Sequence, residues 1–323
     1  MKLKRYWILL PAIIAFALFS PLPRPEAADP FFSQIAGAII LSPTLTATAT
    51  TTSTPTAAPT NTPTQTPTFV PMLTPTSTHT PIPTRDSNTR AVRVPILMYH
   101  YVSNPPPDAD KYRLDLSVTP ANFEAQMQYL AREGYHPIRV SDLGDHLLNG
   151  TPLPSKPIAI TFDDGYCDNY ENALPVLKQL KFPATFFVIT RFIDMHREGY
   201  MTWDQLEEMA IEGMEIGSHS LTHPDLQGKS REIQTTEIFG SKAMIEARIG
   251  TPVKSFSYPA SQYDARTMDI TRAAGYRAAV TADAQGTLHS VNAIYELKRI
   301  RVRGSYSVND LAYWIKYFMA NGK

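Results

Sequence analysis

Short apolar runs alternate with amphipathic stretches along most of the chain. The runs are rich in β-branched and aromatic residues and predict buried strands at 94–99, 157–162, 184–190, 214–218, 253–258 and 278–281. Apolar side chains recur at helical spacing in 119–130, 174–180, 202–210 and 230–249, and a last helix is expected around 311–319. Alternating strands and helices predict a parallel sheet, and about seven such units predict a barrel.

Residues that favour helix ends support these boundaries. Thr119 followed by Pro120 is a typical helix start, and Thr202 is a second N-cap candidate. Gly250 is expected to end the longest helix, because glycine readily adopts the left-handed conformation found there.

The first thirty residues have the pattern of a targeting segment. Lys2, Lys4 and Arg5 precede an apolar run, residues 7–19. A positive flank before a short apolar core is typical of a secretory signal, and thirteen residues are few for a helix that must cross ~30 Å of hydrocarbon. We expect residues 1–30 to be a signal peptide, with a retained membrane anchor as the alternative.

A low-complexity stretch follows, and residues 31–84 contain no charged side chain. Between residues 42 and 84, 18 of 43 positions are Thr and 9 are Pro. The stretch therefore has too few apolar side chains to form a core. We expect residues 31–91 to be a disordered, extended linker, also suited to O-glycosylation, and residues 92–323 to be the folded domain.

Charge and cysteine content exclude several classes of site. The 30 basic and 30 acidic side chains balance, which argues against a nucleic acid partner. A single cysteine, Cys167, rules out an intrachain disulfide and a Cys₄ zinc site. A bound metal would therefore need histidine and carboxylate ligands.

Three polar clusters follow predicted strands. In the first, Asp163 and Asp164 precede Gly165, and only a turn lets two adjacent carboxylates serve one site. Taken alone, this cluster is better explained as a solvated turn. In the second, His219 and His223 are four residues apart, but Pro224 disfavours a helix there, and two surface histidines remain the alternative. The third cluster, residues 256–261, is uninformative by itself.

Taken together, the clusters resemble the polysaccharide deacetylase family, also called the NodB-homology or carbohydrate esterase family 4 domain. The resemblance extends from about Val94 to the C-terminus and includes the segments 95–100, 161–166 with 168–169, 184–187 and 219–223. It implies a distorted (β/α) barrel that holds one divalent metal, for which two imidazoles and a carboxylate suit zinc.

The resemblance also implies roles for individual residues. Asp163 would be the catalytic base, and Asp164, His219 and His223 would be the metal ligands. The backbone N–H of Ala260 would stabilise the oxyanion. Three residues of the matched motifs are expected to contact substrate: Tyr166, Tyr258 and Pro259.

This chain departs from the family pattern at two places. The third family motif often carries an Arg that orients the catalytic Asp, but Ser257 stands there, so Arg299 or Arg301 is the expected substitute. The late Leu-x-His motif, source of the general acid, is also missing, since Leu288 and His289 are adjacent. His100 is our candidate for the acid or for a substrate contact, with a structural rim histidine as the alternative.

The expected activity is removal of N-acetyl groups from a polysaccharide containing N-acetylglucosamine (GlcNAc), such as peptidoglycan, poly-N-acetylglucosamine or chitin. The protein would act outside the cytoplasm, secreted or tethered to the membrane or cell wall. Two alternatives are an inactive, metal-retaining carbohydrate-binding protein and an acetyl-xylan esterase. An intact Asp163 favours an enzyme, because a binding protein needs no base beside its metal.

Overall fold

The computed structural model describes residues 90–282 and 285–322. The expected signal segment, 1–30, and nearly all of the expected linker, 31–91, lie outside the described residues. Within the part that is described, no helix is both long and apolar enough to cross a bilayer.

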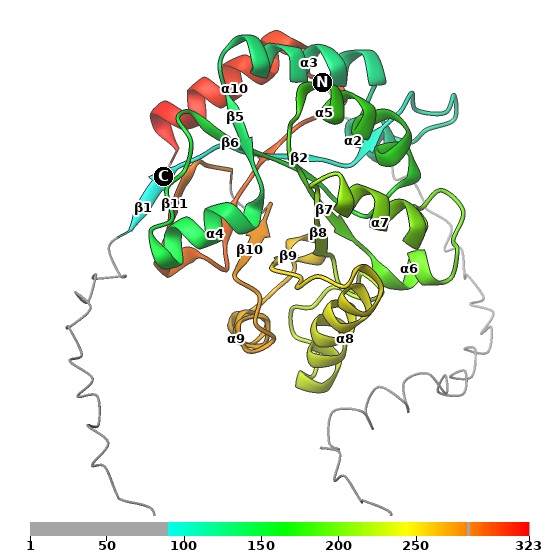
Figure 1. The fold of residues 1–323 in the computed structure, drawn as a ribbon. Coiled ribbons are helices and arrows are strands. Elements are labelled where there is room, and N and C mark those ends of the chain that lie inside the picture. The colour runs from blue at the N-terminus through cyan, green and yellow to red at the C-terminus, as the bar shows by residue number, and fades with distance from the viewer. Residues whose placement is uncertain (1–89, 283–284, 323) are drawn as a thin grey trace, which may run out of the picture. The chain divides into compact units, whose positions relative to one another are not determined.

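A nearly closed parallel sheet forms the centre of the domain (Figure 1). In spatial order its strands are β12 (Leu297–Lys298), β10 (Ala278–Thr281), β9 (Ser255–Ser257), β8 (Glu215–Ser218), β7 (Thr185–Val188), β6 (Pro157–Phe162), β2 (Ile96–Tyr99) and β13 (Ile300–Arg301). β12 and β13 are separated only by Arg299, and they pair with β10 and β2 at the two ends of the sheet. Counted as one run, they close a barrel of seven strands, as the sequence pattern predicted. β5 (His136–Ile138) adds to the first half of β6.

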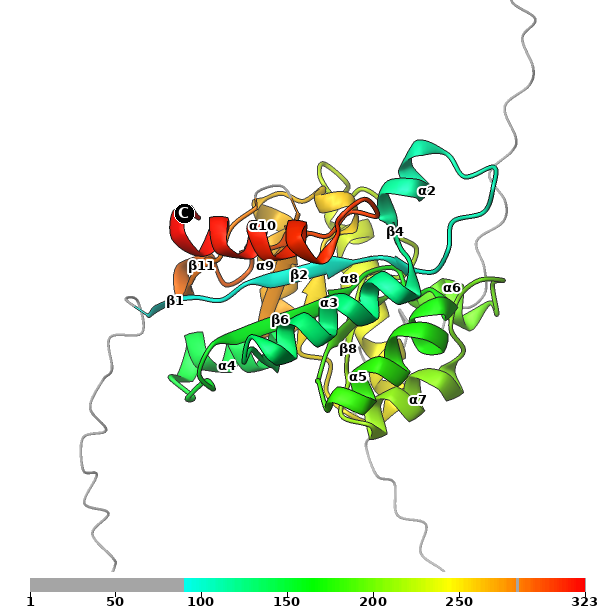
Figure 2. The same ribbon diagram turned by 90° about the horizontal axis from the view of Figure 1, so that it is seen from above.

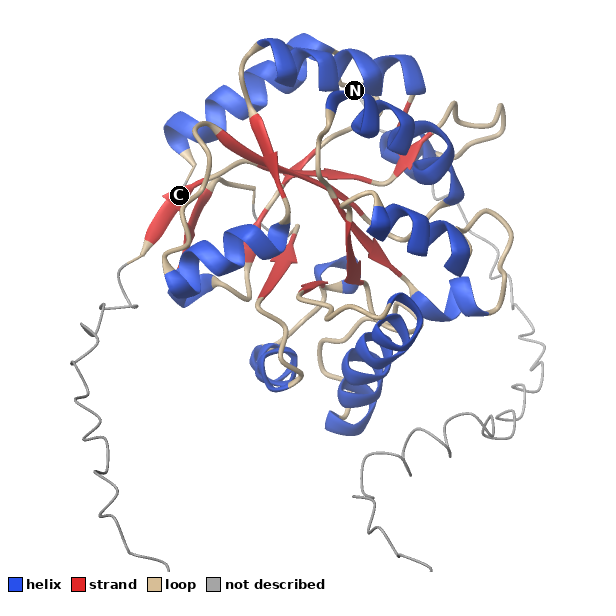
Figure 3. Cartoon of the chain, in the orientation of Figure 1, coloured by secondary structure: helices blue, strands red, loops and turns tan. Residues whose placement is uncertain are grey.

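Helices surround the barrel (Figures 1 and 3). They are α2 (Lys111–Leu116), α3 (Pro120–Arg132), α4 (Val140–Asn149), α5 (Leu174–Leu180), α6 (Thr190–Asp194), α7 (Trp203–Ile211), α8 (Arg231–Ile249), α9 (Ala265–Ala273) and α10 (Val308–Asn321). Short helical turns occur at η2 (Asn169–Ala173), η3 (Pro259–Ser261) and η4 (Val291–Ala293). Two small strand pairs lie outside the barrel sheet: β1 (Ala91–Arg93) with β11 (Leu288–Ser290), and β3 (Tyr101–Val102) with β4 (Ser117–Val118).

The predicted helix ends are confirmed. The Thr119 side chain accepts a hydrogen bond from the Asn122 amide at the start of α3, and Thr202 caps α7 through Gln205. Gly250 ends α8 with a φ of 73°. The apolar pattern did not predict α4, which contains Gly144; a side chain there would press on Ala278, with a Cβ–Cβ distance of 3.3 Å.

Side chains of β6 alternate between two environments. Ile158, Ile160 and Phe162 pack in the large core shared with the helices α3, α5 and α7. Ala159 belongs to a second cluster that includes Phe187 and Leu297 from other strands of the barrel. Because strand residues alternate in direction, Ala159, Thr161 and Asp163 point to the same side of the sheet, the barrel interior. The interior therefore changes from apolar to ionisable toward the carboxyl end of β6.

In Figure 1, α10 lies on one side of the barrel and α8 and α9 lie on the opposite side; Figure 2 shows the same barrel from above. Gly217 of β8 faces the interior beside Phe187, whose ring would lie 2.6 Å from a Cβ at this position. A large ring on one strand thus needs a glycine on its neighbour.

Candidate metal centre and active site

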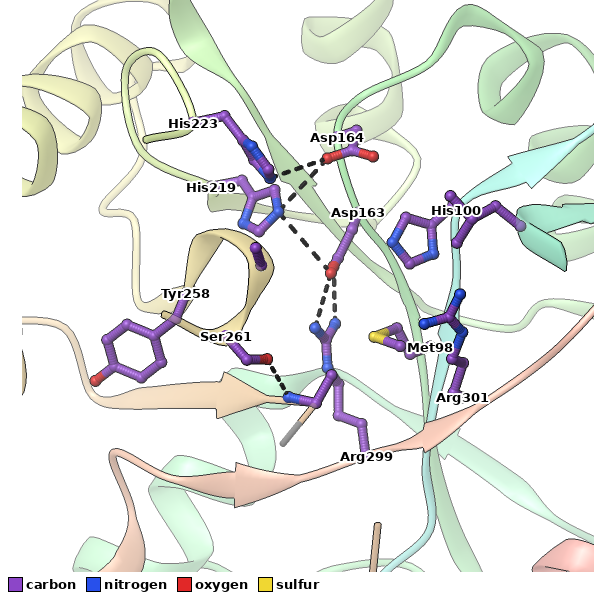
Figure 4. Close-up of a pocket in the computed structure, with 13 residues that line it drawn as sticks. Met98, His100, Asp163, Asp164, His219, His223, Tyr258, Ser261, Arg299 and Arg301 are labelled. Carbon is purple, nitrogen blue, oxygen red and sulfur yellow. Dashed lines mark hydrogen bonds and ion pairs between the residues drawn. The ribbon is translucent and has the colours of Figure 1, made fainter. Parts of the chain in front are cut away.

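The polar clusters predicted from the sequence meet at the carboxyl ends of the barrel strands (Figure 4). They line one pocket of about 340 Å³. Its lining includes His100, Asp163, Asp164, His219, His223, Tyr258, Ala260, Arg299 and Arg301. Active sites of (β/α) barrels are found at this end, because loops after several strands converge there.

A left-handed turn lets both aspartates face the pocket. β6 ends at Phe162, and Asp164 and Gly165 then have φ values of 75° and 86°. Aspartate tolerates this conformation better than most residues. Space is also tight at Gly165, since an added Cβ would lie 3.2 Å from the Val188 side chain. The turn expected from the sequence is thus present.

Asp164, His219 and His223 bring three donor atoms within 4.8 Å of one another. Asp164 Oδ1 lies 3.5 Å from His219 Nε2 and 3.6 Å from His223 Nε2. Ligands of a tetrahedral ion with bonds of ~2.0–2.1 Å are roughly 3.3–3.4 Å apart. The spacing therefore fits a small cation such as zinc.

The proton on His219 is directed away from this cluster. Its Nδ1–H donates to the Ser257 carbonyl oxygen over 2.8 Å. Burial lowers the pKa of His219 and favours the neutral ring, although both aspartates oppose this shift. Nε2 then offers a lone pair toward the Asp164 carboxylate, and two facing electron-pair donors are stable only with a cation or proton between them.

Asp163 is held by a buried arginine rather than by the cluster. The Arg299 guanidinium donates from Nη1 to Oδ1 and from Nη2 to Oδ2, each over 2.7 Å. Both side chains are almost fully buried. Burial alone would raise the pKa of Asp163, but the charge and hydrogen bonds of Arg299, with a contribution from His219, hold it well below its usual range. Asp163 is therefore ionised, with Oδ2 4.0 Å from His219 Nε2.

The hydroxyl groups of Thr161 and Ser257 fix the arginine. Thr161 Oγ1 accepts from Arg299 Nη1, and Ser257 Oγ accepts from Nη2, both at 3.2 Å. Ser257 Oγ also donates to Asp163 over 3.3 Å. From the sequence, Ser257 was noted only as the position where the family arginine is missing, and no role was predicted for Thr161. The alternation of strand residues was the available indication, since Thr161 shares a strand face with Asp163.

His100 follows β2 and lines the pocket beside Asp163 (Figure 4). Burial lowers its pKa, while the charges of Asp164 and Asp163 oppose this effect. Its Nδ1 is buried without a hydrogen-bond partner among the described residues. The ring therefore holds an unsatisfied polar atom next to the pocket.

The loop after β9 forms one part of the pocket wall. Ala260 lines the pocket, and Ala260 and Ser261 have φ values of 48° and 56°. Tyr258 is 1% exposed, stacks on Tyr263 and points its ring away from Asp163 in Figure 4. Pro259 is buried and not among the residues that line this pocket.

Unusual backbone conformations are concentrated at this site. The described residues include eight non-glycine positions with positive φ, and five of them are in the three site loops: Asp164, Ser220, His223, Ala260 and Ser261. Such conformations cost free energy, and they are retained where surrounding contacts hold a functional arrangement.

Other candidates lie apart from the centre. Tyr166 stacks on Tyr101 with ring centroids 3.6 Å apart and does not line the described pocket. His289 is buried in β11, where its Nε2–H donates to the Val94 carbonyl oxygen. Arg301 does line the pocket, but it pairs with Asp115 of α2 at 2.5 Å instead of with Asp163.

Comparisons with known proteins agree with this geometry. The family model for polysaccharide deacetylases matches residues 150–279. YxkH of Bacillus subtilis, which is named as a polysaccharide deacetylase, is 32% identical over 227 residues, covering 70% of this chain and 77% of that protein. The poly-β-1,6-N-acetyl-D-glucosamine N-deacetylase of Escherichia coli K12 is 29% identical over 119 residues, which is 32% of this chain and 18% of that enzyme.

A solved structure is similar over nearly its whole length. The Streptococcus pyogenes deacetylase PplD, in complex with acetate, superposes with a TM-score of 0.64 at 30% identity, covering 70% of this chain and 99% of PplD. With the barrel, the paired aspartates and the two histidines in place, this chain belongs to the polysaccharide deacetylase family.

Proposed function

We propose that this protein is a metal-dependent hydrolase that removes N-acetyl groups from a GlcNAc-containing polysaccharide. The observation that carries the proposal is the pair of adjacent aspartates with different surroundings. Asp164 faces two histidines, whereas Asp163 faces Arg299 and stays ionised beside them. A metal centre with a separate base is an arrangement that can hydrolyse an amide.

Asp164, His219 and His223 would hold the ion, and we propose zinc from the spacing and type of these donors. When bound, the ion would polarise the acetamido carbonyl group and lower the pKa of the attacking water. Asp163 would accept a proton from that water, and Arg299 keeps the carboxylate charged and oriented.

The remaining steps are assigned to two other residues that line the pocket. The Ala260 N–H is proposed to donate to the oxygen of the tetrahedral intermediate. His100 is proposed to give a proton to the leaving amine as the carbon–nitrogen bond breaks, which yields acetate and a free amino sugar. The position of His100 in the pocket lining beside Asp163 supports this assignment.

The choice of substrate rests on the relatives. Curated relatives in E. coli and Staphylococcus aureus are named poly-β-1,6-N-acetyl-D-glucosamine N-deacetylases. Such polymers lie outside the cytoplasm. We therefore also propose that residues 1–30 direct export of the chain, which is then secreted or stays anchored, with the threonine- and proline-rich segment as a spacer. Cell fractionation with an antibody to the folded domain tests this proposal, and a purely cytosolic protein would contradict it.

Acetate release tests the activity. Purified protein loaded with zinc is incubated with poly-N-acetylglucosamine, chitin oligomers, peptidoglycan and acetylated xylan, and acetate is quantified. Release from a GlcNAc polymer, abolished by a chelator and restored by zinc, is expected. Release from acetyl-xylan alone would indicate an esterase, and binding of a GlcNAc polymer without release would indicate an inactive binding protein.

A further inference from the structure

The loop that carries both histidine ligands has a backbone that its own sequence does not favour. After β8 the chain runs through residues 219–223, with φ values of 67° at Ser220 and 62° at His223. Neither residue is glycine, so left-handed backbone at both positions is unfavourable. Contacts from outside the loop must therefore stabilise it.

We propose that Glu237 of α8 is a positioning residue for the metal ligands. Its Oε2 accepts hydrogen bonds from the backbone amides of Leu221 and Thr222, each over 2.9 Å. Its Oε1 accepts from the Thr222 hydroxyl over 2.6 Å. One buried carboxylate thus accepts three hydrogen bonds from two of the three residues that lie between the ligands.

The same face of α8 supports the loop at two further points. Gly240 and Ser241 follow Glu237 by three and four residues and so lie beside it on the helix. A Cβ at position 240 would come within 2.8 Å of Leu221 Cδ1. The Ser241 hydroxyl lies 2.6 Å from that of Ser218, which accepts from the Ser220 amide over 3.2 Å.

These contacts leave little freedom to the histidines. The Leu221 carbonyl oxygen also accepts from the Arg191 amide in α6 over 2.9 Å, so the loop is fixed on two sides. Within it, the His223 amide donates to Ser220 Oγ over 2.9 Å. Without Glu237 the two amides at 221 and 222 would lack their acceptor, and the spacing between His219 and His223 would relax.

The inference rests on the proposed metal site, and its test is zinc affinity in the absence of any polysaccharide. Competition with a chelator gives the dissociation constant for the full chain and for Glu237→Ala. We expect binding to weaken roughly 10- to 100-fold, as is typical when a group that orients metal ligands is removed. Substitution with Co²⁺ should show an altered absorption spectrum in the variant, because the ligand geometry changes.

Glu246 provides a matched control on the same helix. Its Oε1 also accepts from a loop amide, that of Val253, over 2.9 Å, but among the described residues its hydrogen bonds and ion pairs go to Lys242 and Val253 and not to residues 219–223. Glu246→Ala should lower stability without changing the zinc dissociation constant. Glu237→Gln, which retains an acceptor oxygen, should bind zinc within a few-fold of the unchanged chain.

A folded Glu237→Ala protein with unchanged zinc affinity would overturn the proposal. Should that variant not fold, Glu237→Asp decides the question, because it keeps the charge but withdraws the carboxylate from the loop; unchanged affinity would again overturn it. Zinc binding without acetate release would contradict the proposed function alone, whereas equal zinc affinity of all variants would contradict only the role of Glu237.

Discussion

Arg299 donates two 2.7 Å hydrogen bonds to the Asp163 carboxylate from 136 positions further along the chain. It occupies the one position between β12 and β13, where the run that closes the barrel changes partner. The hydroxyls of Thr161 and Ser257 complete its surroundings. A small residue at 257 and an arginine at 299 therefore belong together, and the charge beside Asp163 is supplied from a different strand than the family pattern suggested.

Replacing Arg299 should damage both folding and activity. Arg299→Met leaves the Asp163 carboxylate buried without its counter-charge, so the free energy of unfolding should fall by about 3–5 kcal/mol. Arg299→Lys keeps one charge but not the paired hydrogen bonds, and it should lose activity while retaining zinc. Arg303→Lys is the control, since Arg303 is an exposed partner of Asp115 and should change stability by less than about 1 kcal/mol. If denaturant titration found Arg299→Met and Arg303→Lys equally stable, this account would be contradicted.

Removing a metal ligand should remove the metal. Alanine at Asp164, His219 or His223 leaves two protein ligands, which hold zinc weakly. Elemental analysis after dialysis should then find close to one zinc per wild-type chain and little in each variant. His136→Ala, an exposed histidine in β5, should keep its zinc. Full occupancy in all three ligand variants would rule out this cluster as the metal site.

His289 should make the domain sensitive to acid independently of the metal. Burial lowers its pKa to about 4, helped by the charge of Lys298 and opposed by the bond to Val94. In the unfolded chain the pKa is about 6.5, so below that value the unfolded chain binds more protons and stability falls until about pH 4. Between pH 7.5 and pH 5 this effect amounts to about 2 kcal/mol.

The variant His289→Gln isolates this contribution. Glutamine can donate to the same carbonyl oxygen and does not titrate. Unfolding free energies measured at pH 7.5 and pH 5 should therefore fall less in the variant than in the wild type. Equal losses in the two proteins would show that His289 is not responsible.

Much of the barrel could be predicted because its strands are continuous apolar runs and its helices carry regular stripes. The pattern also marked 297–302 as a candidate strand, but it could not show that this run is divided between two neighbours, to each of which it contributes only two residues. The helix α4 was missed for a related reason: Gly144 lowers its helical propensity and is explained only by the closeness of Ala278.

The candidate site, too, could be predicted from the sequence only in part. Asp163, Asp164, His219 and His223 stand close together in sequence within pairs, so local spacing marked them as candidates, and the resemblance to the family supplied their roles. The choice between Arg299 and Arg301 depends on strand register, and the contacts of Glu237 depend on how α8 packs on a loop fifteen residues away. Neither relationship leaves a periodic signal in the chain.

The most direct test of the central claim is acetate release by Asp163→Asn alongside its zinc content. Asp163 lies outside the ligand cluster, so the variant should bind zinc as the wild type does. It lacks the base, so turnover on a GlcNAc polymer should fall roughly 100- to 10,000-fold. A stability loss is expected as well, because Arg299 loses its counter-charge, and the assay is therefore run well below the variant's unfolding temperature. A folded, zinc-loaded Asp163→Asn protein that releases acetate at the wild-type rate would contradict the account.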